Sequence, residues 1–323
     1  MKLHENKQLF QQAITATSQA KSNLSEVLVE KDYWVCYTLK KLALSNHVDY
    51  AIFKGGTSLS KAYKLIDRFS EDIDLAVIAK GMSGNKVKTL IKKIEQDITA
   101  TDYLTEVEID GITSKKSKFR KTIHEYPKMV KGAKFGQASD KLLLEINSFT
   151  NPYPYELRSI TTYIADFLAG TEQLDFIKEY ELEPVEVNVL SLKRTFTEKL
   201  MGLVRVSYDE NPVSELSRRI RHVYDLHMLV GESDVRKFME DKVQLKEMIE
   251  HVKNDDRENH EFDGDWLDVP LLESPLLRDN TLLKKLASTY NGNDFKGLVF
   301  GDLPPFESVL VSINDIKQNL YSI

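Results

Sequence analysis

The sequence contains one cysteine, Cys36, among its 323 residues. A disulfide within the chain and a zinc cluster built on cysteines are therefore excluded. Glycine (14) and proline (9) are too few for a fibrous or low-complexity chain. No apolar run approaches the roughly 20 residues of a membrane-spanning helix, and the N-terminus lacks the apolar segment of a secretory signal. These absences predict a soluble, cytoplasmic globular protein.

A net positive charge is also lacking, because the formal net charge is −6 at pH 7. Bulk coating of nucleic acid, which requires net positive charge, is therefore excluded, although a local basic site is not. A basic stretch over 112–134 and an acidic stretch over 255–268 make the charge distribution uneven. We interpret the acidic stretch as a solvated loop, with contact to a basic partner protein as the alternative.

Hydrophobic patterning predicts a core of helices and strands followed by a helical region. Helices are expected over 1–46, 58–67, 86–100, 163–168 and 175–180, and strands over 50–53, 72–78, 104–112, 141–149 and 185–189. After residue 191 helices dominate, over 191–207, 213–231, 233–253, 280–290 and 305–321. The fold class is therefore α/β (α+β) with a mixed sheet over 1–190, and a helical domain over 191–323.

Two glycines, Gly55 and Gly56, follow the first expected strand. Glycines at this point let the backbone turn tightly and approach a ligand closely. Thr57 or Ser58 can cap the next helix, whose first N–H groups favour a phosphate. The spacing is not that of a Walker loop. By itself, this segment is better explained by an ordinary turn between strand and helix.

Two carboxylates, Asp72 and Asp74, lie at the start of the second expected strand, 16 residues after Gly56. Residues two apart on a strand point to the same face, so both carboxylates are expected to face outward together. Carboxylate oxygens are the ligands that Mg²⁺ prefers, and Mg²⁺ keeps sites open for substrate phosphates. Solvated acids at a strand start are the alternative, but the combination with a glycine turn favours a phosphate site.

A third carboxylate, Glu145, interrupts an apolar run that is expected to form a strand. An ionised side chain is costly there unless it is paired or bound to a metal. Glu145 could complete a two-metal site for phosphoryl displacement. An acid facing water on an edge strand is the alternative.

Two further charged residues lie on expected helices. Lys199 lies beside an apolar helical stripe of Leu192, Phe196, Leu200 and Leu203, and could bind a triphosphate as a point charge. A surface lysine is the alternative for Lys199. Asp225 has Arg221 four residues before it, so a simple ion pair along the helix is the alternative to a role in a site.

The basic stretch carries cations with aromatic residues between them, the usual arrangement for binding single-stranded RNA ends. Its candidate RNA-binding residues are Lys115, Lys116, Lys118, Arg120 and Lys121. A solvated loop without such a function explains the pattern equally well.

These motifs together resemble a known family. Residues 53–61 (FKGGTSLSK) and 68–75 (RFSEDIDL) resemble the AbiE-type (AbiEii-like) nucleotidyltransferase toxins, within the DNA polymerase β-like superfamily. Residues 194–200 resemble the lysine motif of that family, and residues 219–226 resemble its Arg-His-x-Tyr-Asp-Leu motif. The matches run from about residue 50 to 230. Thr57 stands where much of the superfamily has serine, but it keeps the hydroxyl.

The resemblance implies an enzyme that transfers a nucleoside monophosphate from an NTP to an acceptor hydroxyl, with Mg²⁺ as cofactor. The nucleotide is expected in the cleft between core and helical domain. The implied catalytic residues are Asp72, Asp74, Glu145, Lys199 and Asp225, the first three also as metal ligands. The implied nucleotide-binding residues are Gly55, Gly56, Thr57, Ser58, Ser70 and Lys199.

The resemblance also implies a biological setting: bacterial toxin–antitoxin and phage abortive-infection pairs. The expected acceptor is the 3′ end of tRNA, whose modification would block translation, and a cognate antitoxin protein is the expected partner. The alternatives are self-modification at Ser70, transfer of the γ-phosphate by a phosphotransferase, and a non-catalytic binding module of the same fold. The sequence does not identify the NTP, the acceptor or the oligomeric state.

Overall fold

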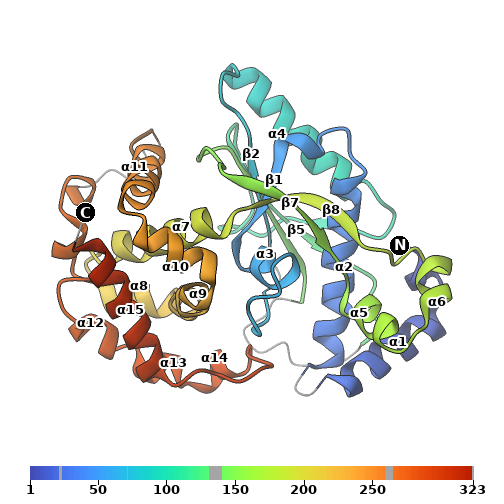
Figure 1. The fold of residues 1–323 in the computed structure, drawn as a ribbon. Coiled ribbons are helices and arrows are strands. Elements are labelled where there is room, and N and C mark those ends of the chain that lie inside the picture. The colour runs from blue at the N-terminus through green and yellow to red at the C-terminus, as the bar shows by residue number, and fades with distance from the viewer. Residues whose placement is uncertain (22–23, 71, 131–139, 259–264, 322–323) are drawn as a thin grey trace. The chain divides into compact units, whose positions relative to one another are not determined.

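The computed structural model describes residues 1–21, 24–70, 72–130, 140–258 and 265–321 (Figure 1). The chain divides into two compact units, Met1–Leu190 and Ser191–Ile323. The first contains a sheet with helices, and the described part of the second is helical. The expected fold class, a mixed sheet followed by a helical region, is confirmed.

An eight-stranded sheet organises the first unit. Its strand order is β3-β5-β6-β2-β1-β8-β7, and β4 pairs with β5 outside this path. The strands are β1 (Ala51–Lys54), β2 (Ile73–Val77), β3 (Thr105–Val107), β4 (Ser114–Lys115), β5 (Phe119–Glu125), β6 (Leu142–Asn147), β7 (Tyr155–Ile160) and β8 (Val185–Leu190). The sheet is mixed, because β1 pairs in parallel with β8 and antiparallel with β2, while β2 pairs in parallel with β6.

Helices of the first unit pack on this sheet and on each other. They are η1 (Leu3–Glu5), α1 (Lys7–Ala20), α2 (Glu26–Ala43), η2 (Val48–Tyr50), α3 (Gly55–Lys61), α4 (Gly84–Thr99), α5 (Tyr163–Gly170) and α6 (Leu174–Glu179). Helix α2 is buried along most of its length and contacts α1, α4, α5 and β8. The apolar stripe of α4, Val87, Ile91, Ile94 and Ile98, is buried, as its 3.6-residue period requires.

Several expected boundaries are wrong. Helix α3 begins at Gly55 and ends at Lys61, whereas the pattern predicted a helix over 58–67. Lys54 is its N-cap, and neither Thr57 nor Ser58 caps it. The strand expected over 104–112 shrinks to the three residues of β3. Strands β4, β5 and β7 were not expected at all.

The second unit contains helices α7 (Leu192–Val206), α8 (Pro212–Arg218), α9 (Ile220–Gly231), α10 (Ser233–Glu240), α11 (Lys242–Glu258), α12 (Thr281–Lys284), α13 (Ala287–Tyr290), α14 (Asn293–Lys296) and α15 (Phe306–Leu320). Short 3-10 turns, η4 (Asp265–Leu267) and η5 (Leu271–Glu273), lie between α11 and α12. The helix expected over 213–231 is thus two helices, α8 and α9. No helix among the described residues has the length and apolar character needed to cross a bilayer.

The acidic stretch begins inside α11 rather than in a loop. Asp255 and Asp256 are buried, and they form ion pairs with Arg194 and Arg205 of α7. Burial opposes the charge of Arg194, but Asp255 and the neighbouring Glu198 outweigh it and raise the pKa of the guanidinium. The prediction of a solvated loop is therefore wrong for these two acids. Residues 259–264 of the stretch lie outside the described part of the chain.

Candidate active site

The glycine turn lies directly against one of the two predicted aspartates. Gly55 has a φ of +82°, a left-handed conformation that L-residues with a side chain rarely adopt. A β-carbon on Gly55 would overlap Oδ2 of Asp74 and lie 3.2 Å from its Cγ. Glycine is thus required here for two reasons, the backbone conformation and the space that Asp74 occupies. The structure brings the turn and the carboxylate together, as their spacing predicted.

The second glycine faces two other polar groups. A β-carbon on Gly56 would lie 2.6 Å from Nη2 of Arg68 and 2.7 Å from Oγ of Ser70. The hydroxyl of Thr57 donates a hydrogen bond to that of Ser70 at 3.0 Å. Arg68 is buried, with 2% of its surface exposed. A guanidinium and two hydroxyls therefore surround the turn, and all three are groups that bind phosphate oxygens.

The C-terminal end of α3 has a buried ionic anchor. The ammonium of Lys61, the last residue of α3, pairs with the carboxylate of Asp32 on α2 and lies 4.1 Å from the ring centre of Tyr163. The other carboxylate oxygen of Asp32 accepts a hydrogen bond from the Tyr163 amide at 2.7 Å. Burial opposes the charge of Lys61, but Asp32 outweighs it and raises the pKa of the ammonium. This pair ties α3 to α2 and α5, and so fixes the glycine turn.

A row of charged residues crosses four neighbouring strands. Lys54 of β1 is opposite Asp74 of β2, Asp74 is opposite Glu145 of β6, and Glu145 is opposite Lys121 of β5. Residues directly opposite each other on paired strands share one face of the sheet. The two carboxylates are thus neighbours, with a lysine on each side. The ammonium of Lys121 lies 3.7 Å from Glu145, and both side chains are about 30% exposed (30% and 29%).

Glu145 therefore lies on an inner strand, not on an edge. Its neighbours in the strand, Leu144 and Ile146, are buried on the opposite face. Asp72 precedes β2 by one residue and is half-buried, as is Asp74. The alternation predicted both aspartates on one face, and the burial of Ile73 between them and of Leu75 after them agrees with it.

Divalent metal fits these residues in its chemistry. Their oxygens are the hard donors that Mg²⁺ selects, and Mg²⁺ is usually held by one or two carboxylates together with waters and substrate phosphates. Within the described residues, no three acidic, histidine or cysteine side chains converge as a preformed metal cage.

Two predicted residues lie in the second unit and contact each other there. The ammonium of Lys199 on α7 lies 2.7 Å from the carboxylate of Asp225 on α9. The side chains are 6% and 0% exposed. A surface lysine is thus the wrong description of Lys199, and Asp225 pairs with it from another helix. Asp225 fixes the position of the Lys199 ammonium.

The basic stretch is divided between the two faces of the sheet. Lys121 shares the face of Glu145, whereas Arg120 points to the other face and pairs with Glu95 of α4. Lys115 pairs with Glu106 at 2.5 Å. Lys116 and Lys118 are exposed. A loop is therefore the wrong description of β4 and β5, and three of the five proposed RNA-binding cations have acidic partners; residues 131–134 lie outside the described chain.

Comparison with known proteins decides the family. Residues 37–310 match the family model described as "Nucleotidyl transferase AbiEii toxin, Type IV TA system". The chain belongs to the AbiEii nucleotidyltransferase toxin family. This membership confirms the resemblance of the motifs, and it makes the protein a nucleotidyltransferase toxin of a toxin–antitoxin system, with an NTP as substrate and an antitoxin as partner.

The AbiEii fold is also found in a solved structure. MenT4, a nucleotidyltransferase toxin from Mycobacterium tuberculosis, superposes with a TM-score of 0.52 and 14% sequence identity. The match covers 94% of this chain and 97% of MenT4. At this identity the likeness concerns the fold alone. No curated protein sequence matches the chain.

Sequence reasoning missed two residues of this AbiEii site. Arg68 was quoted only as part of a motif, although its buried guanidinium lies against Gly56. Lys121 was assigned to RNA binding, although it pairs with Glu145. In both cases the signal lies in tertiary placement. Arg68 could have drawn attention because it stands beside the serine and acidic residues of the motif. Nothing in the local sequence indicates that Lys121 is opposite Glu145.

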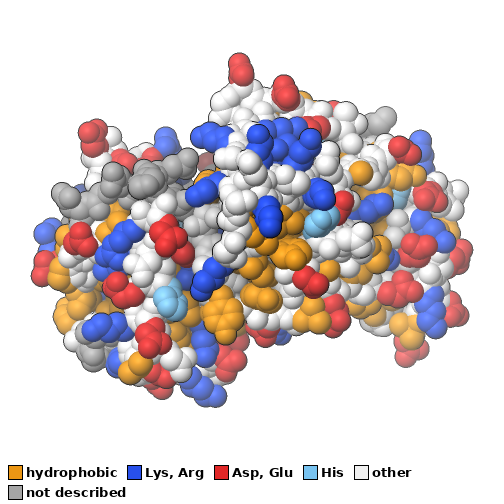
Figure 2. Space-filling view, turned by 90° about the horizontal axis from the view of Figure 1, so that it is seen from above, with side chains coloured by type: hydrophobic (Ala, Val, Ile, Leu, Met, Phe, Trp, Pro, Cys, Tyr) orange, Lys and Arg blue, Asp and Glu red, His pale blue; other side chains and the backbone are white. Residues whose placement is uncertain are grey.

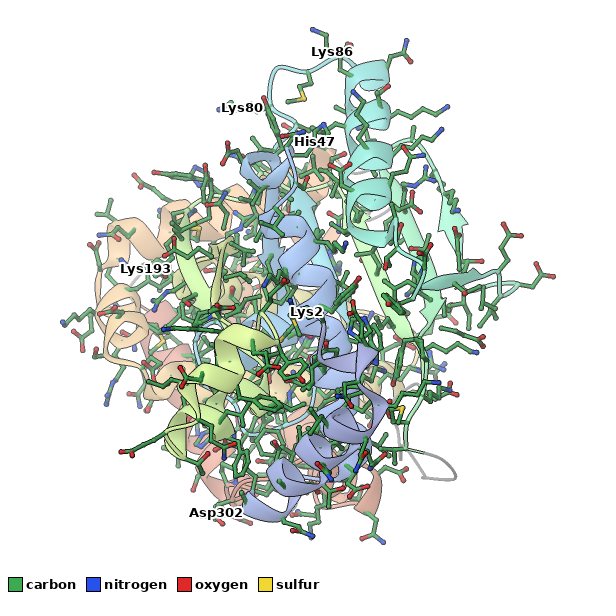
Figure 3. The ribbon with its side chains drawn as sticks, turned by 90° about the vertical axis from the view of Figure 1, so that its right-hand side faces the viewer. Lys2, His47, Lys80, Lys86, Lys193 and Asp302 are labelled. Atoms are coloured by element: carbon green, nitrogen blue, oxygen red, sulfur yellow. The ribbon has the colours of Figure 1, made fainter. Side chains whose placement is uncertain are left out.

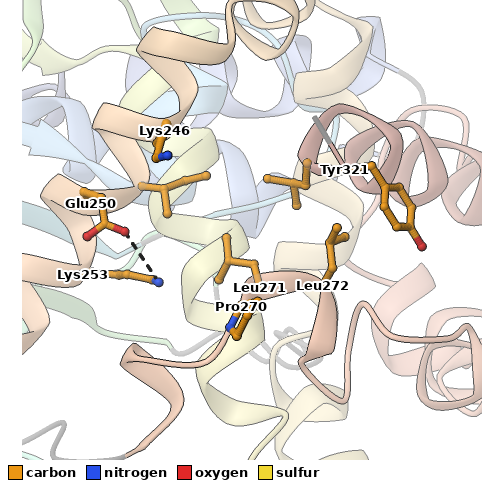
Figure 4. Close-up of a pocket in the computed structure, with 9 residues that line it drawn as sticks. Lys246, Glu250, Lys253, Pro270, Leu271, Leu272 and Tyr321 are labelled. Carbon is orange, nitrogen blue, oxygen red and sulfur yellow. Dashed lines mark ion pairs between the residues drawn. The ribbon is translucent and has the colours of Figure 1, made fainter. Parts of the chain in front are cut away.

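A pocket in the second unit of this AbiEii protein does not coincide with these residues. It has a volume of about 320 Å³ and lies among α11, η5 and the end of α15 (Figure 4). Leucine, isoleucine and proline side chains form much of its wall, and Glu250 and Lys253 pair at its rim at 3.7 Å. Lys246 also lines the pocket, but the pocket contains neither the glycine turn nor the carboxylates of the row, so we do not assign the nucleotide to it.

Proposed function

We propose that this AbiEii toxin transfers a nucleoside monophosphate from an NTP to a hydroxyl of an RNA acceptor, the 3′ end of tRNA, in a Mg²⁺-dependent reaction that releases pyrophosphate and blocks translation. The observation that carries the proposal is the contact of the glycine turn with Asp74, which is in register with Glu145. Phosphate-binding groups and paired carboxylates on one sheet face are what nucleotidyl transfer needs.

Positioning and charge neutralisation supply most of the catalysis in such transfers. Asp72 and Asp74 would hold Mg²⁺, which supplies positive charge for the triphosphate. The turn from Gly55 to Ser58 would contact phosphate oxygens through its N–H groups. Lys199, held by Asp225, would add a cation for the triphosphate.

Glu145 is assigned a role in activating the attacking hydroxyl of the acceptor. A carboxylate next to Asp74 can accept the proton of that hydroxyl, or it can serve as a further metal ligand. Lys121 would act through Glu145 as a positioning residue, because its ammonium lies 3.7 Å from that carboxylate. In the transfer, the acceptor oxygen forms a bond to the α-phosphorus, the bond from that phosphorus to the bridging oxygen breaks, and pyrophosphate leaves.

The test is to incubate the purified protein with Mg²⁺, total tRNA and each α-³²P-labelled NTP in turn. Label on tRNA with release of pyrophosphate is the expected result. Asp72→Asn should abolish it, because the amide removes a metal ligand at nearly constant volume. Asp49→Asn is the matched control, since Asp49 is an exposed aspartate outside the row.

Three results would contradict the proposal. An Asp72→Asn variant as active as the wild type would exclude the carboxylates from catalysis. Transfer of label only from γ-³²P-labelled NTP, with a nucleoside diphosphate as product, would show a phosphotransferase. No transfer of label from α-³²P-labelled or γ-³²P-labelled NTPs would favour a binding module without catalysis.

One observation favours a second candidate, self-modification at Ser70. Its hydroxyl accepts a hydrogen bond from Thr57 in the turn itself and is half-buried there. Label on the protein in the same assay, lost in Ser70→Ala and kept in Ser60→Ala, would identify this reaction. Ser60 is a suitable control because its hydroxyl bonds only within α3, to the Thr57 carbonyl.

A further inference from the structure

A second basic surface lies on α4 and the turn before it, outside the stretch that the sequence singled out. Between Lys80 and Ile94 the chain contains five lysines and no acidic residue. They are Lys80, Lys86, Lys88, Lys92 and Lys93, and all five are exposed. We call them the α4 lysine face. Lys80 and Lys86 extend outward from the first unit in Figure 3, and Figure 2 shows basic side chains gathered on the side of the molecule that α4 occupies in Figure 1.

This arrangement of charge works against the stability of α4. The first turn of the helix contains no acid, and the last contains no basic residue. The helix dipole favours the reverse, by about 0.3–1 kcal/mol for each charge near an end. Lys88 and Lys92 are four residues apart, and like charges at that spacing destabilise a helix by a few tenths of a kcal/mol. A helix that keeps such charges gains nothing in stability from them, which favours a binding role.

Nearby acids leave most of this charge uncompensated. Among the described residues, Lys80, Lys86, Lys88 and Lys92 form no ion pair, whereas Lys93 interacts with Asp97. The basic stretch on β4 and β5 differs, because Lys115, Arg120 and Lys121 all have acidic partners. The α4 lysine face therefore offers more available positive charge than the stretch that the sequence favoured.

The composition of the face identifies the kind of partner. Protein interfaces have an apolar or aromatic centre and are depleted in lysine. Single-stranded nucleic acid is bound with aromatic side chains on which bases stack. The α4 lysine face has no aromatic residue, and the apolar side chains Val87, Ile91 and Ile94 are buried beneath it. Lysines alone match a regular array of phosphates, such as the backbone of a double-stranded stem.

We propose that the α4 lysine face binds the phosphate backbone of a double-stranded stem in a folded RNA. This inference rests on the proposed RNA acceptor and assigns the surface that holds its body. Strand β2 (Ile73–Val77) has Asp74 near its first end, and α4 begins seven residues after its other end, at Gly84. The lysines therefore start beyond the end of β2 that is opposite to the carboxylates. A stem bound there would be held at a distance from the reacting hydroxyl.

The experiment measures binding of a fluorescein-labelled RNA hairpin, with a 20-base-pair stem and a short 3′ overhang, between 50 and 250 mM NaCl and without NTP. The variant replaces Lys80, Lys86, Lys88 and Lys92 with glutamine, which has a similar helix propensity. The control replaces Lys237, Lys284, Lys285 and Lys296 of the second unit, all exposed, and changes the net charge equally. Circular dichroism checks that both variants are folded.

Each lost phosphate contact should lower the slope of log K against log salt by about 0.7–0.9. We expect the α4 variant to lose about 3 in slope and to bind at least about tenfold more weakly at 100 mM NaCl, while the control stays within about twofold. Binding of a U20 single strand should change less than binding of the hairpin.

Four results would overturn the proposal. These are unchanged hairpin binding in the α4 variant, an equal loss in the control, a loss for U20 as large as for the hairpin, and, in a separate pull-down with an acidic protein, a loss of protein binding with hairpin binding kept. A wild type that binds the hairpin through these lysines but transfers no nucleotide would contradict the proposed function and leave this surface in place.

Discussion

Gly55→Ala tests whether the glycine turn controls the position of Asp74. The substitution adds one methyl group at a φ of +82° and directs it into the Asp74 carboxylate. Backbone strain of this kind costs about 1–2 kcal/mol. The variant should therefore remain folded, with a melting temperature lower by a few degrees.

The effect on catalysis should be larger than the effect on stability. Ordinary van der Waals contact begins near 3.4 Å, but the new β-carbon would lie 3.2 Å from Cγ of Asp74 and overlap Oδ2. The carboxylate must therefore move by about 1 Å, and a misplacement of that size can reduce a rate by about 100-fold. We expect the rate of nucleotidyl transfer to fall by about that factor.

Gly81→Ala is the matched control. Gly81 has a φ of +78°, but a β-carbon there would meet nothing within 4 Å. It should lose a similar free energy of unfolding and keep wild-type transfer activity, measured with α-³²P-labelled NTP and tRNA. If Gly55→Ala transfers as fast as Gly81→Ala, the contact with Asp74 does not matter for the reaction, and the assignment of the turn is wrong.

Three further predictions concern charged side chains. Asp225→Asn should lower the free energy of unfolding by about 3 kcal/mol, because it leaves the Lys199 ammonium buried without its carboxylate. Urea unfolding measures this loss. The double variant Lys199→Met/Asp225→Leu should recover the stability but not the activity. Burial, with a smaller effect of the N-terminal ammonium, lowers the pKa of His4 to about 4, so folding resists its protonation and stability should fall as pH drops from about 6.5 to about 4. Urea titrations at pH 7 and pH 4.5 measure the loss of unfolding free energy between these pH values, and His4→Phe should make that loss about 1–3 kcal/mol smaller. An equal loss in the wild type and in His4→Phe would contradict this role of His4. Lys121→Gln should lower kcat about tenfold with little change in the KM for NTP, whereas the exposed Lys118→Gln should stay within twofold; equal effects would exclude a positioning role for Lys121.

Hydrophobic periodicity predicted the elements whose buried and exposed residues differ in polarity. Strands β2, β6 and β8 and helices α4 and α7 belong to this group. Strand β5 was not predicted because it buries polar residues, Thr122 and His124, together with Ile123. Strand β7 was not predicted because it is an edge strand with most of its side chains exposed, and its sequence therefore has no apolar alternation.

The site was predictable where its residues are close in sequence. Asp72 and Asp74 follow from a two-residue spacing, and the apolar run around Glu145 indicated an unusual carboxylate. The pairing of Lys199 with Asp225, by contrast, depends on how α7 packs against α9, and the burial of Asp255 depends on Arg194 across two helices. Such pairings are set by tertiary packing, which leaves no periodic pattern in the sequence.

The parallel pairing of β1 with β8 has a consequence for the timing of synthesis. Phe53 is paired with Val189, so the strand that precedes the glycine turn is completed only by the last strand of the first unit. At about 5–20 residues per second, a ribosome needs roughly 7–27 s to make the chain between them. We therefore expect a nascent toxin to stay inactive through this interval, and products that end before residue 185 to leave β1 with an open edge and to be removed by proteases.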